Sequence, residues 1–191
     1  MRKLYINQSS LKTQESAVVR DEQRQSIYLL IGKWGIAADS ISAYNMHGGL
    51  VAELKQLSTG LFPKFDLYAY QHKVGTVSKH IAFQNELTFV HGLNWVIVGN
   101  QLKGDYKIYH GLNLVMSVKS GEYNGSHNYK ELVISEIEDE PVCVCLVAIL
   151  DHWAHRNQPL KNRIASRLNP GTNLGQVQYR ITSCSDEDHK K

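Results

Sequence analysis

Cysteine, proline and long hydrophobic runs are all scarce in this sequence. Its 191 residues include three cysteines and four prolines. Three cysteines cannot form a disulfide framework, and a chain of this length buries roughly 70% of the surface that its unfolded form exposes. A hydrophobic core can therefore stabilise it without disulfides or a structural metal. We expect one soluble intracellular protein with reduced thiols.

No segment is long and apolar enough to cross a membrane as a helix. The longest uninterrupted apolar run, residues 142–150, has nine residues, whereas a span takes roughly 20. At the N-terminus a basic start precedes only three apolar residues, which is too short for the core of a signal peptide, about 7 to 15 residues. The sequence predicts a cytoplasmic protein and leaves peripheral association with a membrane open.

A strong excess of charge of one sign is also missing. Lysine and arginine number 21 against 18 acidic residues, so the formal net charge is +3. Proteins that bind duplex DNA have a concentrated basic surface, and we therefore expect no nucleic-acid partner. The sequence contains no phosphate-binding glycine loop, nucleophile elbow or kinase signature. It predicts no catalytic residues, no cofactor, no metal and no enzymatic activity.

Short segments rich in Val, Ile, Tyr, Phe and Trp fill the chain as far as residue 136. They alternate with polar residues and are separated by Gly, Asn, Asp and His, a pattern typical of β-strands. The stretches 41–55, 65–79 and 106–119 look alike, each with a tyrosine-containing strand, a short turn and a second strand. We predict about twelve strands, near residues 3–7, 16–21, 26–33, 39–45, 50–56, 64–70, 73–80, 86–90, 95–102, 106–110, 114–120 and 129–136.

The pattern changes in residues 136–153, which begin with carboxylates and a proline. Both suit the start of a helix, because acidic side chains complement the helix dipole and proline fits a position that needs no N–H donor. Residues 142–150 are apolar on every side, so this helix must be enclosed by protein; a buried strand is the alternative. Closing the hairpins around the helix would remove exposed sheet edges. The sequence thus predicts a mainly β fold, a closed antiparallel barrel of about twelve strands around a central hydrophobic C-terminal helix.

Several segments also resemble a known family. They are Lys3-Leu-Tyr-Ile-Asn-Gln8, Leu61-Phe-Pro-Lys-Phe-Asp-Leu-Tyr68, Gly92-Leu-Asn-Trp-Val-Ile-Val-Gly99 and the terminal helix with its acidic start. From about residue 3 to residue 155 the chain resembles the LURP-one-related family of the Tubby C-terminal-like superfamily. The resemblance implies a twelve-stranded barrel around a central helix. It also implies an intracellular, membrane-associated role, since Tubby domains bind phosphoinositides and phospholipid scramblases share the fold.

Three groups of side chains could carry chemistry, and each has a structural alternative. Cys143 and Cys145 point about 200° apart on a helix and cannot share a metal, so we expect them to pack in the core. His152 and His155, at i and i+3, could bind zinc with further ligands, or interact with the C-terminal end of the helix dipole. The acidic residues 136–140 could hold a divalent cation or complement the dipole at the helix start. We favour the structural alternative each time.

Residues 157–191 form a predicted C-terminal extension to a barrel domain of residues 1–156. In residues 157–168 an apolar stripe, Leu160, Ile164 and Leu168, lies beside Arg156, Lys161, Arg163 and Arg167. Such a short helix could cap one end of the barrel, which we favour, or lie on an anionic membrane surface with its basic side chains extended. Residues 176–182 could add a strand, and we expect residues 185–191 to be disordered.

The sequence therefore supports three functions, in this order. The first is a non-enzymatic binding module that associates with anionic phospholipid headgroups, with Arg156, Lys161, Arg163 and Arg167 as the candidate residues. The second is a scaffold that binds a protein partner. The third is a small-molecule carrier or an enzyme with its site at a barrel mouth, which ranks last because a helix that fills the barrel leaves little cavity.

Overall fold

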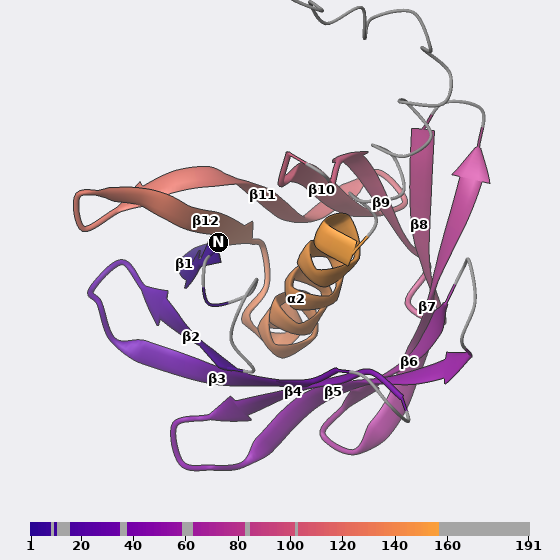
Figure 1. Ribbon diagram of the computed structural model, residues 1–191, viewed down its shortest axis with the longest axis horizontal. Coiled ribbons are helices and arrows are strands. Elements are labelled where there is room, and N and C mark those ends of the chain that lie inside the picture. The colour runs from indigo at the N-terminus through magenta and orange to yellow at the C-terminus, as the bar shows by residue number, and fades with distance from the viewer. Residues whose placement is uncertain are drawn as a thin grey trace, which may run out of the picture. The chain divides into compact units, whose positions relative to one another are not determined.

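Twelve antiparallel strands close into a barrel around one long helix (Figure 1). The computed structural model describes residues 1–8, 10, 16–34, 38–58, 63–82, 85–101 and 103–156, without the side chains of residues 80–82, 85, 86, 155 and 156. The strands are β1 (Arg2–Asn7), β2 (Ser16–Asp21), β3 (Ser26–Lys33), β4 (Ser40–Asn45), β5 (Leu50–Ser58), β6 (Lys64–Ala69), β7 (His72–Ala82), β8 (Asn85–His91), β9 (Trp95–Asn100), β10 (Asp105–His110), β11 (Asn113–Tyr123) and β12 (Ser126–Ile134). A 3-10 helix, η1 (Ile137–Asp139), leads into helix α2 (Glu140–Arg156).

Each strand pairs with its neighbours in sequence, and β1 closes the barrel against β12, with Arg2 opposite Ile134. This confirms the predicted mainly β fold. One hairpin differs from its prediction, because β11 extends to Tyr123 and β12 already begins at Ser126. The turn between them is Asn124-Gly125, with φ of 55° and 75°. Asn-Gly is the preferred pair for a two-residue hairpin turn, so the strands continue up to it.

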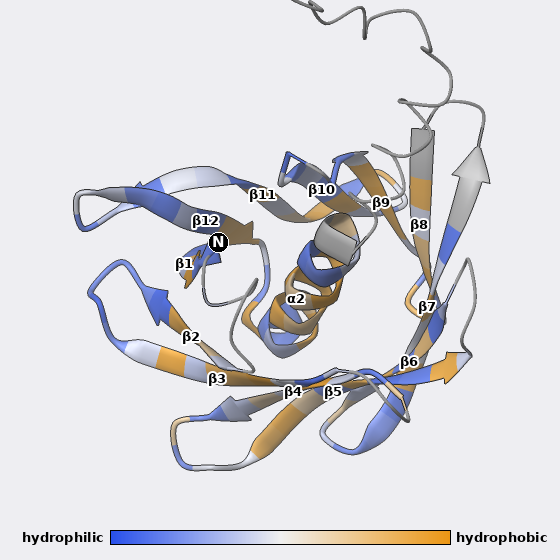
Figure 2. Cartoon of the chain, in the orientation of Figure 1, coloured by the Kyte–Doolittle hydropathy of each residue, from blue (hydrophilic) through white to orange (hydrophobic). Residues whose placement is uncertain are grey.

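Alternating side chains of the strands point into the barrel and pack against α2. Ala52, Leu54, Val77, Met116 and Val118, which alternate with polar residues in the repeated hairpins, are all buried. Every residue from 142 to 150 is at most 5% exposed. Figure 2 shows this hydrophobic helix inside the ring of strands. The enclosed helix is confirmed, and the alternative of a buried strand is wrong.

The two ends of the barrel differ because α2 begins at one and finishes at the other. At the end that we call the entry end lie the turns 22–25, 46–49, 70–71, 92–94 and 111–112, together with the start of β1 and η1. At the opposite, exit end, Trp153 of α2 packs edge-on against Phe65, the second residue of β6, with ring centroids 5.4 Å apart. The helix therefore runs along the inside of the barrel between the two ends.

Candidate functional site

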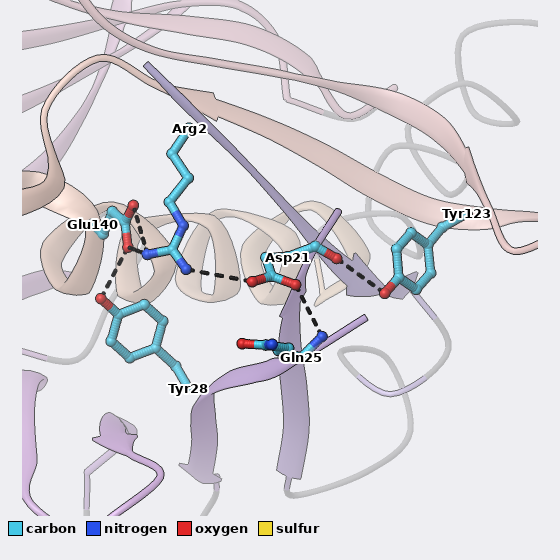
Figure 3. Close-up of polar contacts among 6 residues, drawn as sticks. All are labelled: Arg2, Asp21, Gln25, Tyr28, Tyr123 and Glu140. Carbon is cyan, nitrogen blue, oxygen red and sulfur yellow. Dashed lines mark hydrogen bonds and ion pairs between the residues drawn. The ribbon is translucent and has the colours of Figure 1, made fainter. Parts of the chain in front are cut away.

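A polar cluster fixes the first residue of α2 inside the entry end (Figure 3). The Glu140 side chain is fully buried; its Oε2 lies 3.2 Å from an Arg2 guanidinium nitrogen and accepts a hydrogen bond of 3.0 Å from the Tyr28 hydroxyl. Burial, reinforced by the Glu140 carboxylate, raises the pKa of Tyr28 well above its usual range. Arg2 also lies 3.6 Å from an Asp21 carboxylate oxygen. Glu140 thus joins α2 to β1 and β3.

The same cluster extends to the turn between β2 and β3. Asp21 accepts a 2.9 Å hydrogen bond from the Gln25 backbone N–H, and its carbonyl oxygen accepts one of 3.1 Å from the Tyr123 hydroxyl. Figure 3 shows the chain of contacts running from Glu140 through Arg2 and Asp21 to Tyr123. These residues hold strands and helix together, which is a structural role.

The predicted acidic stretch is divided by this arrangement. Glu140 is engaged in the interior, whereas Glu136 and Glu138 are exposed and Asp139 is partly buried at η1. Burial, with Glu136 and Glu138 adding to it, raises the pKa of Asp139. Within the described part of the chain, no three His, Cys, Asp or Glu side chains are placed so that they could hold a metal ion.

A second polar contact fixes α2 near the exit end. Lys130 of β12 and Asp151 of α2 form an ion pair in which each side chain is only 3% exposed. The Tyr106 hydroxyl is buried, with no hydrogen-bond partner among the described residues. Its pKa is raised well above the usual range by burial and by the nearby Asp151 carboxylate. Sequence analysis did not identify this cluster.

His152 lies on the same turn of α2 and faces the loop after β3. Its ring stacks on Trp34 with centroids 3.7 Å apart, and its Nε2 lies 3.8 Å from an Asp39 carboxylate oxygen. The side chain of His155, which the disfavoured zinc alternative would pair with His152, lies outside the described residues. The contacts that the structure shows for His152 therefore serve packing.

Cys143 and Cys145 are fully buried in the core, as predicted. Burial raises the pKa of both thiols, and it raises the pKa of Tyr28 and Tyr106 in the same way. Thiols and phenols of the unfolded chain ionise near pH 8.5 and 10 respectively. Above these values the folded chain keeps protons that the unfolded chain releases, so the stability must fall as the pH rises.

We therefore predict that the urea midpoint falls between pH 8 and pH 10. Each buried thiol contributes a slope approaching about 1.4 kcal/mol per pH unit above roughly pH 8.5. The double variant Cys143→Ala/Cys145→Ala, less stable at pH 8, should show a shallower loss over the same range. Equal slopes in the two proteins would show that the thiols do not contribute.

A groove opens at the entry end beside η1. Its cavity volume is about 630 Å³, and its lining includes apolar side chains of Leu93, Trp95, Leu114 and Val115. Its polar lining comprises Asn94, His110, Asn113, Ser135, Glu136 and Asp139. An apolar surface with carboxylates at one side can bind a ligand that is itself apolar and basic.

Exposed apolar side chains gather at the same end of the barrel. Of the six large hydrophobic residues described as exposed, five belong to the entry end and one, Leu57, lies in the exit half of β5. Leu112 is 99% and Ile137 63% exposed, and both adjoin residues that line the groove. The remaining three are Met1, Met46 and Tyr70. A contiguous apolar patch is typical of an interaction site, and Leu112 and Ile137 are the exposed apolar residues that adjoin the groove.

Of the four predicted lipid-binding residues, only Arg156 belongs to the part of the chain that the structure describes, and it lies at the other end of the barrel. Arg156 is the last residue of α2, so its backbone lies at the exit end. Lys161, Arg163 and Arg167, like the rest of the predicted extension, lie outside the described residues, so this cluster and the domain boundary at residue 156 stay predictions. Sequence analysis missed other exposed cations that the barrel brings to the exit end: Lys33, Lys64 and Lys103. They are far apart in sequence, and only strand order brings them to one rim.

Comparison with known proteins agrees with this architecture. The chain is 23% identical over 151 residues to the Bacillus subtilis protein YxjI, named as uncharacterized, and this covers 79% of the chain and 93% of YxjI. An X-ray structure of an Arabidopsis thaliana protein has a similar fold, with a TM-score of 0.54 and 15% identity over 79% of this chain and 90% of that one. Residues 2–151 match the family described as LURP-one-related. The chain therefore belongs to the LURP-one-related family.

Proposed function

We propose that the protein is a non-enzymatic module that binds anionic phospholipid headgroups at a membrane surface through its exit end. The observation that supports this is the placement of Arg156 at the end of α2, on the rim with the exposed Lys33, Lys64 and Lys103. The basic residues Lys161, Arg163 and Arg167 follow directly in the sequence. Each lysine or arginine near an acidic membrane contributes about 1 kcal/mol.

Such binding would be peripheral. No helix among the described residues is long and apolar enough to span a bilayer. The exit end also contains the exposed carboxylates Asp105 and Glu122, of which Glu122 lies 3.6 Å from His127. We therefore expect weak, reversible association that decreases as salt screens the charges.

Flotation with liposomes tests the proposal. The full chain should float with vesicles that contain phosphatidylserine or a phosphoinositide at 50 mM salt, and flotation should be lost at about 0.5 M salt. Reversing two charges in Arg163→Glu/Arg167→Glu should reduce the partition coefficient about 30-fold or more, since at least about 2 kcal/mol of attraction is removed. Lys107→Glu, a single charge reversal on the exposed wall of β10, is the control and should float like the wild type. Equal flotation with neutral and acidic vesicles, or none, would refute the proposal.

A protein-binding scaffold is the second candidate, and a different observation favours it. The groove and the five exposed apolar residues lie at the entry end, away from the proposed lipid surface. A carrier is less well supported, because α2 occupies the interior where barrel carriers hold a ligand.

A further inference from the structure

The groove at the entry end combines apolar surface with carboxylates. Ile137 projects from η1 between Glu136 and Glu138, and no ion pair within 4.0 Å is found for Glu136, Glu138 or Asp139 among the described residues. Four apolar side chains line the groove, and the exposed Leu112 adjoins the lining residue Asn113. A ligand that matches both features needs an apolar stripe flanked by cations.

We propose that this groove binds residues 157–168 of a second copy of the chain. On a helix, the spacing of Leu160, Ile164 and Leu168 would place them in one stripe, with Arg163 and Arg167 along one side of it. An amphipathic helix that places such i, i+4 and i+8 anchors in a hydrophobic groove is a common mode of peptide recognition. The arginines would lie against the acidic side of the groove and compensate its charge.

We assign the occupant to another molecule because the connection between α2 and Leu160 is short. α2 has 17 residues and so extends roughly 25 Å from the entry end to the exit end. Leu160 follows Arg156 by only four residues, which span at most about 14 Å. Binding is therefore head-to-tail, between the exit end of one copy and the entry end of the next, and produces rings or open chains.

A synthetic peptide of residues 156–169, labelled with a fluorophore, gives the first test. Its anisotropy should rise saturably on titration with the full-length protein, and the affinity should fall at least tenfold in Glu136→Lys/Asp139→Lys. The matched control is Asp105→Lys/Glu122→Lys, which reverses two exposed acids at the exit end and should bind the peptide like the wild type. Absence of binding, or equal weakening in the two double variants, overturns the proposal.

A charge exchange between full-length chains gives the second test, by sedimentation velocity. The wild type should show concentration-dependent association, while Glu136→Lys/Asp139→Lys and Arg163→Glu/Arg167→Glu should each remain monomeric. Mixing the two variants should restore association, because the unaltered segment of one then meets the unaltered groove of the other, and the two reversed sets of charges also face each other. A mixture that stays monomeric, while the wild type associates, contradicts the pairing.

This inference goes beyond lipid binding, and the two proposals fail separately. Glu136→Lys/Asp139→Lys should lose self-association and still float with acidic vesicles, since its exit end is unchanged. If the wild type does not float but the charge exchange succeeds, the proposed lipid function is wrong and the groove assignment stands. If the wild type floats but does not self-associate, the groove assignment is wrong and the proposed lipid function stands.

Discussion

Replacing Lys130 with methionine is expected to lower the free energy of unfolding by about 3–5 kcal/mol. The methionine side chain has a similar volume, so the change removes the charge and leaves the packing nearly intact. Asp151 would then remain in the core as a buried carboxylate without its cation, with only 3% of its side chain exposed. An uncompensated buried charge costs far more than the pair itself contributes.

The double variant Lys130→Met/Asp151→Leu separates the loss of the ion pair from the cost of leaving the Asp151 carboxylate buried without its cation. It should recover most of the lost stability, since the buried charge is gone as well. Lys119→Met is the surface control: Lys119 pairs with Glu131 at 3.1 Å but is 62% exposed, so its loss should cost less than about 1 kcal/mol. Guanidinium titration of the four proteins gives the comparison. A double variant as unstable as Lys130→Met alone would show that the charge of Asp151 is not what destabilises it.

The sequence carried enough information to predict the barrel, for a physical reason. Residues 142–150 are apolar on every side, too few to span a bilayer and too hydrophobic for water, so the preceding strands had to enclose them. The alternation in the strands agreed with this requirement. The exact ends of hairpins were less predictable, as at Asn124, where turn chemistry extends two strands beyond their regular alternation.

The buried polar contacts could not be predicted from the sequence, for a different reason. Lys130 is in phase with Leu132 and Ile134, so strict alternation places it inside the barrel, yet a lone lysine usually lies at the surface. Its partner Asp151 comes 21 residues later. Arg2 and Glu140 are 138 residues apart. A pairing over such distances follows from barrel closure and has no local signal.

The groove was likewise invisible in the sequence. Its apolar lining comes from the turn before β9 and the first residues of β9 and β11, and its acidic side from η1 and the residue before it. The acidic residues 136–140 are evident in the sequence, but the turns that lie beside them follow only from the strand order, which places these turns at one end of the barrel. Leu112 and Ile137, isolated in the sequence, become neighbours of one groove in the fold.

A chain that ends at Ser135, before η1 and α2, is expected not to form the barrel at all. A helix of 17 residues is a cylinder roughly 25 Å long and 10 Å wide, about 2,000 Å³. At about 24 cal/mol per Å³ of cavity, an empty interior of that size would cost about 45–50 kcal/mol, several times the roughly 5–15 kcal/mol that a folded domain has in total. The strands would therefore collapse or aggregate rather than stand open.

A chain that ends at Asn157 is the matched control, because it retains α2 and all twelve strands. It should unfold cooperatively, with a free energy of unfolding within about 1 kcal/mol of the full chain, if the predicted extension begins where the barrel domain ends. Near-UV circular dichroism, dye binding to exposed hydrophobic surface and urea titration distinguish the two truncated chains. Cooperative unfolding of the chain that ends at Ser135 would show that the strands are stable without the helix that they enclose. In that case α2 would not be the required core of the barrel.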